Sequence, residues 1–128
     1  MPQANGKFDV KLVPQTASDT IPGRYSIDKQ FHGDLTGTSK GDMVAALTAG
    51  GSGGYVAMEQ VTGTLAGRTG SFLLQHSGTS VRGEKSLLIT VVPDSGTGEL
   101  EGLAGKMTIQ IDDGKHDYEF EYTLPVRP

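Results

Sequence analysis

The chain has 128 residues, a length that favours one domain spanning residues 1–128. The absence of cysteine excludes a disulfide framework and a thiolate metal site. The 19 glycines and 6 prolines indicate a turn-rich all-β protein. The net charge of −4, without a cluster of lysine and arginine, argues against nucleic-acid partners, and no stretch approaches the roughly 20 apolar residues that span a membrane.

Apolar and polar residues alternate from near the N-terminus onward, which is the pattern of half-buried β-strands. The first ten residues, MPQANGKFDV, lack an apolar run preceded by positive charge, so we expect no signal peptide. Phe8, Val10 and Leu12 then share one face of the first strand, and residues 14–24 form a loop. In chain order, the expected strands cover residues 7–12, 25–35, 42–48, 55–65, 71–79, 86–92, 106–111 and 116–124.

Glycine-containing turns separate several of these strands. Gly50–Gly54 joins the third to the fourth, and the Asp-Gly pair within Asp112–Lys115 is a hairpin signal before the eighth. Eight short strands without crossover helices predict an eight-stranded antiparallel up-and-down barrel, with a β-sandwich as the alternative. A barrel of this size is either filled by its side chains or holds one small ligand.

Several polar side chains fall on the apolar, inward face of their strands. A hairpin centred on Gly67 would place Glu59 opposite Gln75 and Met58 opposite His76. The candidate ligand-binding set, accompanied by Tyr25 and Tyr55, is Lys29, Glu59, Gln75, His116, Tyr118 and Tyr122. A carboxylate in such a lumen could act as an acid or base, but a satisfied Lys29–Glu59 pair is the structural alternative.

Other motif matches do not predict a site. Gly50–Gly54 has the spacing of a serine-hydrolase nucleophile elbow, but a strand follows it where that motif needs a helix. Gly96–Gly98 lacks the third glycine and the helix of a dinucleotide fingerprint. His116 falls on an apolar strand face and His32 on a polar one, so the histidines would point to opposite sides of the wall. We therefore expect neither a metal nor a cofactor.

The fourth, fifth and sixth strands are apolar on both faces, a feature that soluble monomers rarely expose. We expect a homo-oligomer, dimer or trimer, formed through the outer wall of these strands. The residues expected to be buried in that interface are Met58, Phe72, Leu74 and His76.

Four segments resemble a bacterial family of uncharacterised proteins: KQFHGDLTGTSKGDM, YVAMEQVTGTLAGRTGSFLLQHSGTS, VVPDSGTGELEGL and HDYEFEYTL. The resemblance covers the chain from about Phe8 to Leu124, and the loop at residues 14–24 is its least matched part. It implies a barrel like that of allene oxide cyclase and a cytoplasmic bacterial setting. It implies no activity, because transfer of the cyclase chemistry would rest on the fold alone.

Three functions remain open at this point. The first is a barrel that binds a small, mostly apolar molecule, and the second is a cofactor-free isomerase or cyclase that uses Glu59 and a tyrosine. The third is a filled barrel that acts through its surface. If a lumen exists, the loop at residues 14–24 and the turn at Gly50–Gly54 mark its mouth, with His116 and Tyr118 near the entrance and Glu59 and Gln75 deeper.

Overall fold

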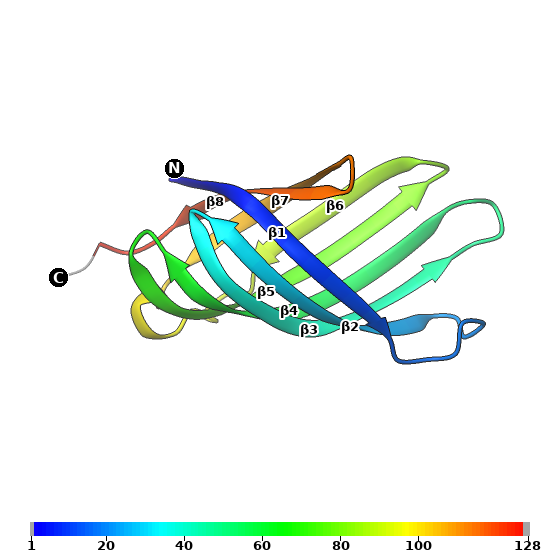
Figure 1. Cartoon of the computed structure of the whole chain (residues 1–128), viewed down its shortest axis with the longest axis horizontal. Coiled ribbons are helices and arrows are strands. Elements are labelled where there is room, and N and C mark those ends of the chain that lie inside the picture. The colour runs from blue at the N-terminus through cyan, green and yellow to red at the C-terminus, as the bar shows by residue number, and fades with distance from the viewer. Residues whose placement is uncertain (1, 127–128) are drawn as a thin grey trace.

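The computed structural model describes residues 2–126, which form a closed barrel of antiparallel strands (Figure 1). This confirms the predicted up-and-down barrel and excludes the sandwich. No helix within residues 2–126 has the length and apolar character needed to cross a membrane. The strands are β1 (Gln3–Pro14), β2 (Gly23–Gly33), β3 (Leu35–Leu47), β4 (Gly53–Leu65), β5 (Arg68–Val81), β6 (Glu84–Val91), β7 (Ala104–Asp112) and β8 (Lys115–Thr123).

Each strand pairs with its neighbour in sequence, and β1 pairs with β8 to close the sheet. Consecutive strands are joined at alternate ends of the barrel. The β1–β2 loop and the β3–β4 and β5–β6 turns extend from one end, and the start of β1 and the end of β8 lie toward the other (Figure 1). We call these the loop end and the terminal end.

Strand β3 begins at Leu35, seven residues earlier than the sequence predicts. Its first half contains glycines, and in the sequence these residues indicate a turn. Here they serve close strand approach instead: a Cβ at Gly37 would lie 2.2 Å from the Thr62 carbonyl oxygen, and one at Gly63 would lie 2.1 Å from that of Thr36. Glycine in a strand marks such a contact as readily as it marks a turn.

The terminal half of the barrel is filled by apolar side chains. Phe72 and Phe120 stack with their ring centroids 6.0 Å apart, and Phe31 meets Tyr118 edge to face. A short 3-10 helix, η1 (Gly98–Leu100), lies in the β6–β7 connection and buries Leu100 completely. This end is therefore closed by a packed core, and any cavity has to lie toward the loop end.

The contact between β6 and β7 is the weakest in the wall. Only Ile89 with Met107 and Thr90 with Lys106 are paired there among the described residues, whereas β4 and β5 pair over their whole length from Gly53 to Leu65. From Leu88 toward the loop end, β6 therefore runs without ladder partners on β7. We call this unpaired stretch the β6–β7 seam.

The β4–β5 register differs by one residue from the predicted one. A two-residue turn at Ala66 and Gly67, with φ of 52° and 76°, pairs Leu65 with Arg68 and therefore Glu59 with Leu74. A one-residue change in register moves every side chain to the opposite face. The prediction was therefore wrong for β5. Gln75 is exposed on the outer wall, and the residues inside the barrel are Phe72, Leu74 and His76.

Candidate functional site

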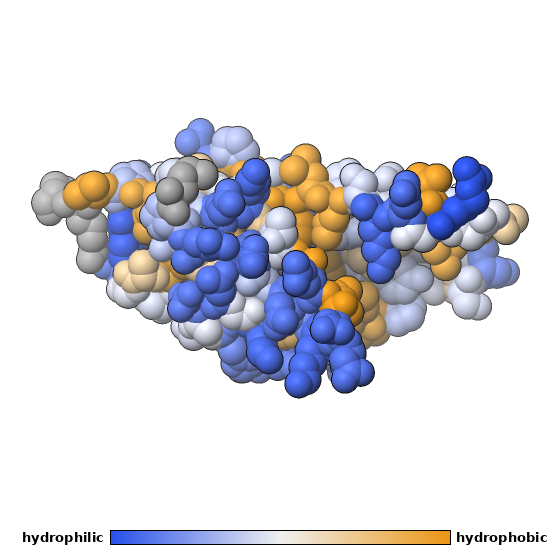
Figure 2. All heavy atoms as spheres, turned by 90° about the horizontal axis from the view of Figure 1, so that it is seen from above, coloured by the Kyte–Doolittle hydropathy of each residue, from blue (hydrophilic) through white to orange (hydrophobic). Residues whose placement is uncertain are grey.

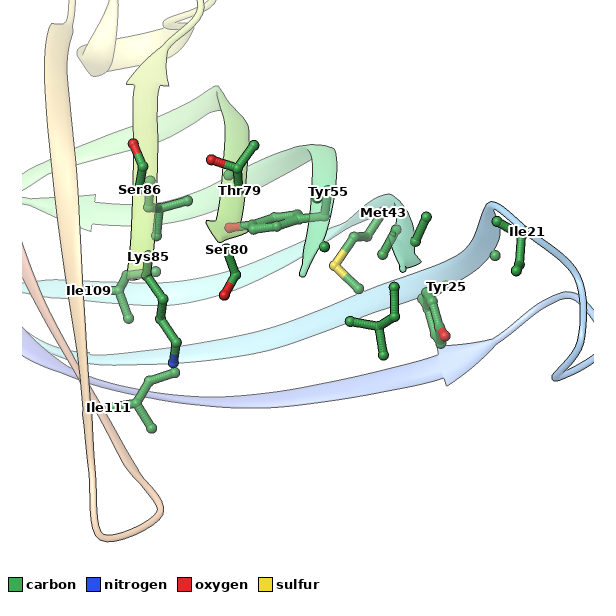
Figure 3. Close-up of a pocket in the computed structure, with 18 of the residues that line it drawn as sticks. Ile21, Tyr25, Met43, Tyr55, Thr79, Ser80, Lys85, Ser86, Ile109 and Ile111 are labelled. Carbon is green, nitrogen blue, oxygen red and sulfur yellow. The ribbon is translucent and has the colours of Figure 1, made fainter. Parts of the chain in front are cut away.

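A cavity of about 1060 Å³ occupies the loop end of the barrel. Apolar and aromatic side chains make up much of its wall, among them Tyr25, Met43, Tyr55 and Ile109 (Figure 3). Leu87 also lines the cavity. Ser18, Thr20 and Ile21 of the β1–β2 loop contribute to its rim, as do the first residues of β2 and β4. The open end is therefore the one that the sequence predicts.

The cavity also borders the β6–β7 seam. Lys85 reaches from β6 toward Ile109 and Ile111 of β7, across a gap that no backbone ladder closes (Figure 3). Seen from above the barrel of Figure 1, hydrophobic atoms lie in the middle of the face, between two groups of hydrophilic side chains (Figure 2). The cavity is thus bordered by the loop end of the barrel and by the β6–β7 seam in its side wall.

Below the cavity, a cluster of buried polar side chains surrounds Glu59. Its carboxylate accepts hydrogen bonds from Lys29 Nζ at 2.8 Å, Ser39 Oγ at 2.7 Å and His76 Nε2 at 2.5 Å. All four side chains are buried, and within residues 2–126 no buried side-chain nitrogen or oxygen lacks a partner. Lys29 also lies over the ring of Phe8, 4.8 Å from its centroid. We call these four residues the Glu59 cluster.

The environment of Glu59 fixes its charge. Burial by itself raises the pKa of a carboxyl group, because it disfavours the charged form. Here the hydrogen bond from His76 and the positive charge and hydrogen bond of Lys29 outweigh burial, and they lower the pKa of Glu59 to about 2. Glu59 is therefore a carboxylate at neutral pH, held by donors on three sides.

Tyr55 connects the Glu59 cluster to the cavity. Its side chain lines the cavity, and its hydroxyl lies 3.3 Å from Nδ1 of His76. The paired residue on β5 is Gly78, where a Cβ would come within 2.6 Å of the Tyr55 ring, so the missing side chain makes room for that ring. Burial, followed by the negative charge of Glu59, raises the pKa of Tyr55, which keeps its hydroxyl protonated. The result is a hydrogen-bonded chain from the cavity to a buried carboxylate.

The comparisons with known proteins identify a family of unknown function. The model of a family described as a protein of unknown function, DUF3224, matches residues 4–122. The chain belongs to this DUF3224 family. A crystal structure of a DUF3224 protein of unknown function from Shewanella oneidensis MR-1 is similar over 99% of both chains, with 48% sequence identity and a TM-score of 0.92. No curated protein matches. The resemblance to a family of uncharacterised proteins is confirmed, and the likeness to allene oxide cyclase stays a prediction.

Two of the predicted DUF3224 site residues come together as expected. Lys29 and Glu59 both point into the barrel and pair there, as the structural alternative proposed. Gln75 does not join them, because of the register difference in β5. His76 and Ser39 take part instead. His76 could have been found only from the register that the Ala66-Gly67 turn sets for β5. The sequence contains no local signal for Ser39.

The three candidate site residues on β8 of the DUF3224 barrel face inward, but away from the cavity. The hydroxyl of Tyr118 accepts from Leu35 N at 2.9 Å and lies 3.0 Å from the carbonyl oxygens of His32 and Leu35, near the β2–β3 turn. That turn is at the terminal end, so the placement of Tyr118 near the entrance is wrong. Strand tilt explains the difference, since the start of one strand lies beside the far end of another.

The other two β8 candidates are also packing residues in this DUF3224 structure. The ring of His116 packs against Phe8, with centroids 5.1 Å apart, and Tyr122 stacks on Phe120 at 5.4 Å. Neither lines the cavity. On the outer wall His32 contacts Asp9, so His32 and His116 lie on opposite sides, as the alternation predicts. No set of three or more potential metal ligands is grouped anywhere in residues 2–126.

Proposed function

We propose that this DUF3224 protein binds one small, mostly apolar molecule in the cavity at the loop end. The observation that carries the proposal is a large cavity walled mainly by apolar side chains, with Tyr55 connecting it to His76 of the Glu59 cluster. Ligand sites in proteins typically have volumes of roughly 300–1,000 Å³ and combine an apolar lining with a few polar groups. The same observation argues against a barrel filled along its whole length.

The cavity wall sets the expected ligand. Met43, Leu87 and Ile109 offer apolar contact, while the charged residues that line the cavity within residues 2–126 are Lys85 and Asp112. A ligand that buries hydrocarbon against this wall gains about 25 cal/mol per Å² of apolar surface removed from water. The matching molecule is therefore mostly hydrocarbon, with one or two polar atoms that can reach Tyr55.

The first prediction tests this cavity with N-phenyl-1-naphthylamine, an apolar dye whose fluorescence rises on leaving water. Ala45 lines the cavity, and Ala45→Trp would fill part of it. We expect this variant to weaken dye binding at least about tenfold. The indole ring would displace apolar contact between dye and wall, and the loss of that contact is worth more than about 1.4 kcal/mol. Fluorescence titration measures the effect.

Thr38→Trp supplies the matched control, because Thr38 is exposed on the outside of the same strand, β3. The control should bind the dye like the unmodified protein. Equal binding by both tryptophan variants and the unmodified protein would locate the dye outside the cavity and contradict the proposal.

A cofactor-free isomerase or cyclase is the second candidate, favoured by the chain from Tyr55 through His76 to Glu59. A carboxylate that orients an imidazole, which in turn contacts a hydroxyl, can move a proton to or from a bound molecule. Glu59→Gln separates the two functions. A binding protein would hold its ligand with modest change, whereas an acid–base enzyme would lose about a hundredfold or more in rate.

We also propose that copies of this chain associate through the outer wall of β4 to β6. Val56 (54% exposed), Met58 (44%) and Leu88 (59%) project from it, and Val56 and Leu88 both lie beside Ser77 in the strand register. The neighbouring outward residues Gln60, Gln75 and Thr90 carry no charge. Because each chain has a net charge of −4, an uncharged wall is where two copies meet with least repulsion.

The second prediction concerns this assembly. We expect a dimer or trimer by light scattering at micromolar concentration, and a monomer after Leu88→Glu, because the new carboxylate would be buried in the interface without a partner. Gln30→Glu, on the exposed outer face of β2, should leave the assembly unchanged. A monomeric unmodified protein would contradict the proposed interface.

A further inference from the structure

The Glu59 cluster has a fixed hydrogen-bond direction. The Glu59 carboxylate is an acceptor only, and it receives hydrogen bonds from Lys29, Ser39 and His76. The ring nitrogen of His76 that faces Glu59 is Nε2, which must therefore carry a proton. Glu59 is thus the acceptor in all three of these hydrogen bonds.

The charge balance of the cluster indicates the role of the other ring nitrogen of His76. Lys29 supplies one positive charge against the one negative charge of Glu59, and this pair is almost wholly removed from water. The cluster is electrically balanced when His76 has a single ring proton, and a second positive charge buried beside Lys29 would be unpaired. With its proton on Nε2, His76 presents Nδ1 as an acceptor.

With the His76 proton on Nε2, Tyr55 is the group that donates to Nδ1. Its hydroxyl has one proton and lies 3.3 Å from Nδ1 of His76. That proton is committed to His76, and the oxygen keeps its lone pairs available to an additional donor. Gly78 leaves room for the ring, so Tyr55 lies along the cavity wall where a bound molecule can reach it (Figure 3).

We propose that Tyr55 makes the cavity selective for a ligand that donates a hydrogen bond, so that an apolar alcohol binds better than the ketone with the same carbon skeleton. An alcohol donates its proton to the Tyr55 oxygen while Tyr55 keeps its bond to His76. A ketone has no proton to donate, so it either leaves the Tyr55 oxygen without that bond or takes the tyrosine proton away from His76. In the second case, Nδ1 of the buried His76 ring is left without a hydrogen-bond donor, which costs free energy. The inference rests on the proposed ligand-binding function and names its ligand class.

Menthol and menthone provide a matched pair of probes, because they share a carbon skeleton and differ as alcohol and ketone. Each is titrated against bound N-phenyl-1-naphthylamine at pH 8, and displacement gives its affinity. We expect menthol to bind about five- to tenfold more tightly than menthone to the unmodified protein, the ratio that one net hydrogen bond of about 1–1.4 kcal/mol produces.

Two tyrosine variants locate the source of that ratio. Tyr55→Phe removes the oxygen and should bring the ratio close to one, while dye binding shows that the cavity is still formed. Tyr25→Phe alters another tyrosine of the cavity wall and should keep the preference for the alcohol. A preference that persists in Tyr55→Phe, or that disappears in Tyr25→Phe, would contradict the role of Tyr55.

The outcomes distinguish this inference from the proposed function. Equal affinity for the two probes, or tighter binding of menthone, in the unmodified protein would overturn the selectivity while leaving the binding function intact. If neither probe displaces the dye and Ala45→Trp does not weaken dye binding, the cavity is not a ligand site, and both proposals fail.

Discussion

Replacing Glu59 with leucine is expected to lower the free energy of unfolding by about 3–5 kcal/mol, the typical cost of leaving one charge of a buried pair without its partner. Lys29 is 7% exposed and contacts the rings of Phe8 and Phe31, so its charge cannot reach water without a rearrangement of the core. Ser39 and His76 lose their acceptor in the same variant. Urea denaturation monitored by circular dichroism measures the loss.

A double variant tests whether the buried charge is the cause. Lys29→Met together with Glu59→Leu removes both members of the pair and places an apolar side chain between the same two phenylalanines. Replacing a whole buried ion pair with apolar residues is often neutral or stabilising. The double variant should therefore be more stable than Glu59→Leu alone, by at least about 1–2 kcal/mol. If it were less stable than Glu59→Leu alone, loss of packing and not an unpaired charge would explain the result.

The second large effect is expected in acid. The pKa of Glu59 is about 2 in the folded protein, against an ordinary value of 4.5. Because the folded-state pKa is lowered, the contribution of Glu59 to stability is fully present above about pH 4.5. It is lost as the pH falls toward 2. The difference between these pKa values corresponds to about 3 kcal/mol, most of which should be gone at about pH 2.5.

Other carboxyl groups also titrate in this range, so the measurement compares two proteins. The free energy of unfolding of the unmodified protein and of the Lys29→Met, Glu59→Leu double variant is measured at pH 7 and at pH 2.5. The unmodified protein should lose about 2–3 kcal/mol more than the double variant. Equal losses would mean that Glu59 does not have its low pKa in the folded protein.

The architecture could be predicted because its signal is local and repeated. Alternation such as Tyr118, Phe120 and Tyr122 against Asp117, Glu119 and Glu121 appears in strand after strand, and each instance indicates a wall with one buried face. The inward direction of Lys29 and Glu59 followed from the same alternation within single strands. Closure into a barrel then followed from eight strands without crossover helices.

The composition of the site could not be predicted in full, because it depends on contacts between strands. Whether Gln75 or His76 faces inward is decided by one residue in the β4–β5 turn, and Ala66-Gly67 is a weaker turn signal than the Asp-Gly of the β7–β8 hairpin. The position of Tyr118 depends on strand tilt, which has no local signature. Ser39 enters the Glu59 cluster through the fold alone.

The β6–β7 seam gives the barrel an uneven stiffness. Elsewhere a change in circumference would break a continuous run of backbone hydrogen bonds, such as the ladder that joins β4 to β5. Between β6 and β7, two residue pairs are the whole backbone ladder within residues 2–126, and the seam beyond them is unpaired, so the barrel can widen there at the smallest free-energy cost. The wall is thus rigid around most of its perimeter and compliant along one line. The width of a bound molecule should consequently affect its affinity less than the hydrogen bond that it forms with Tyr55.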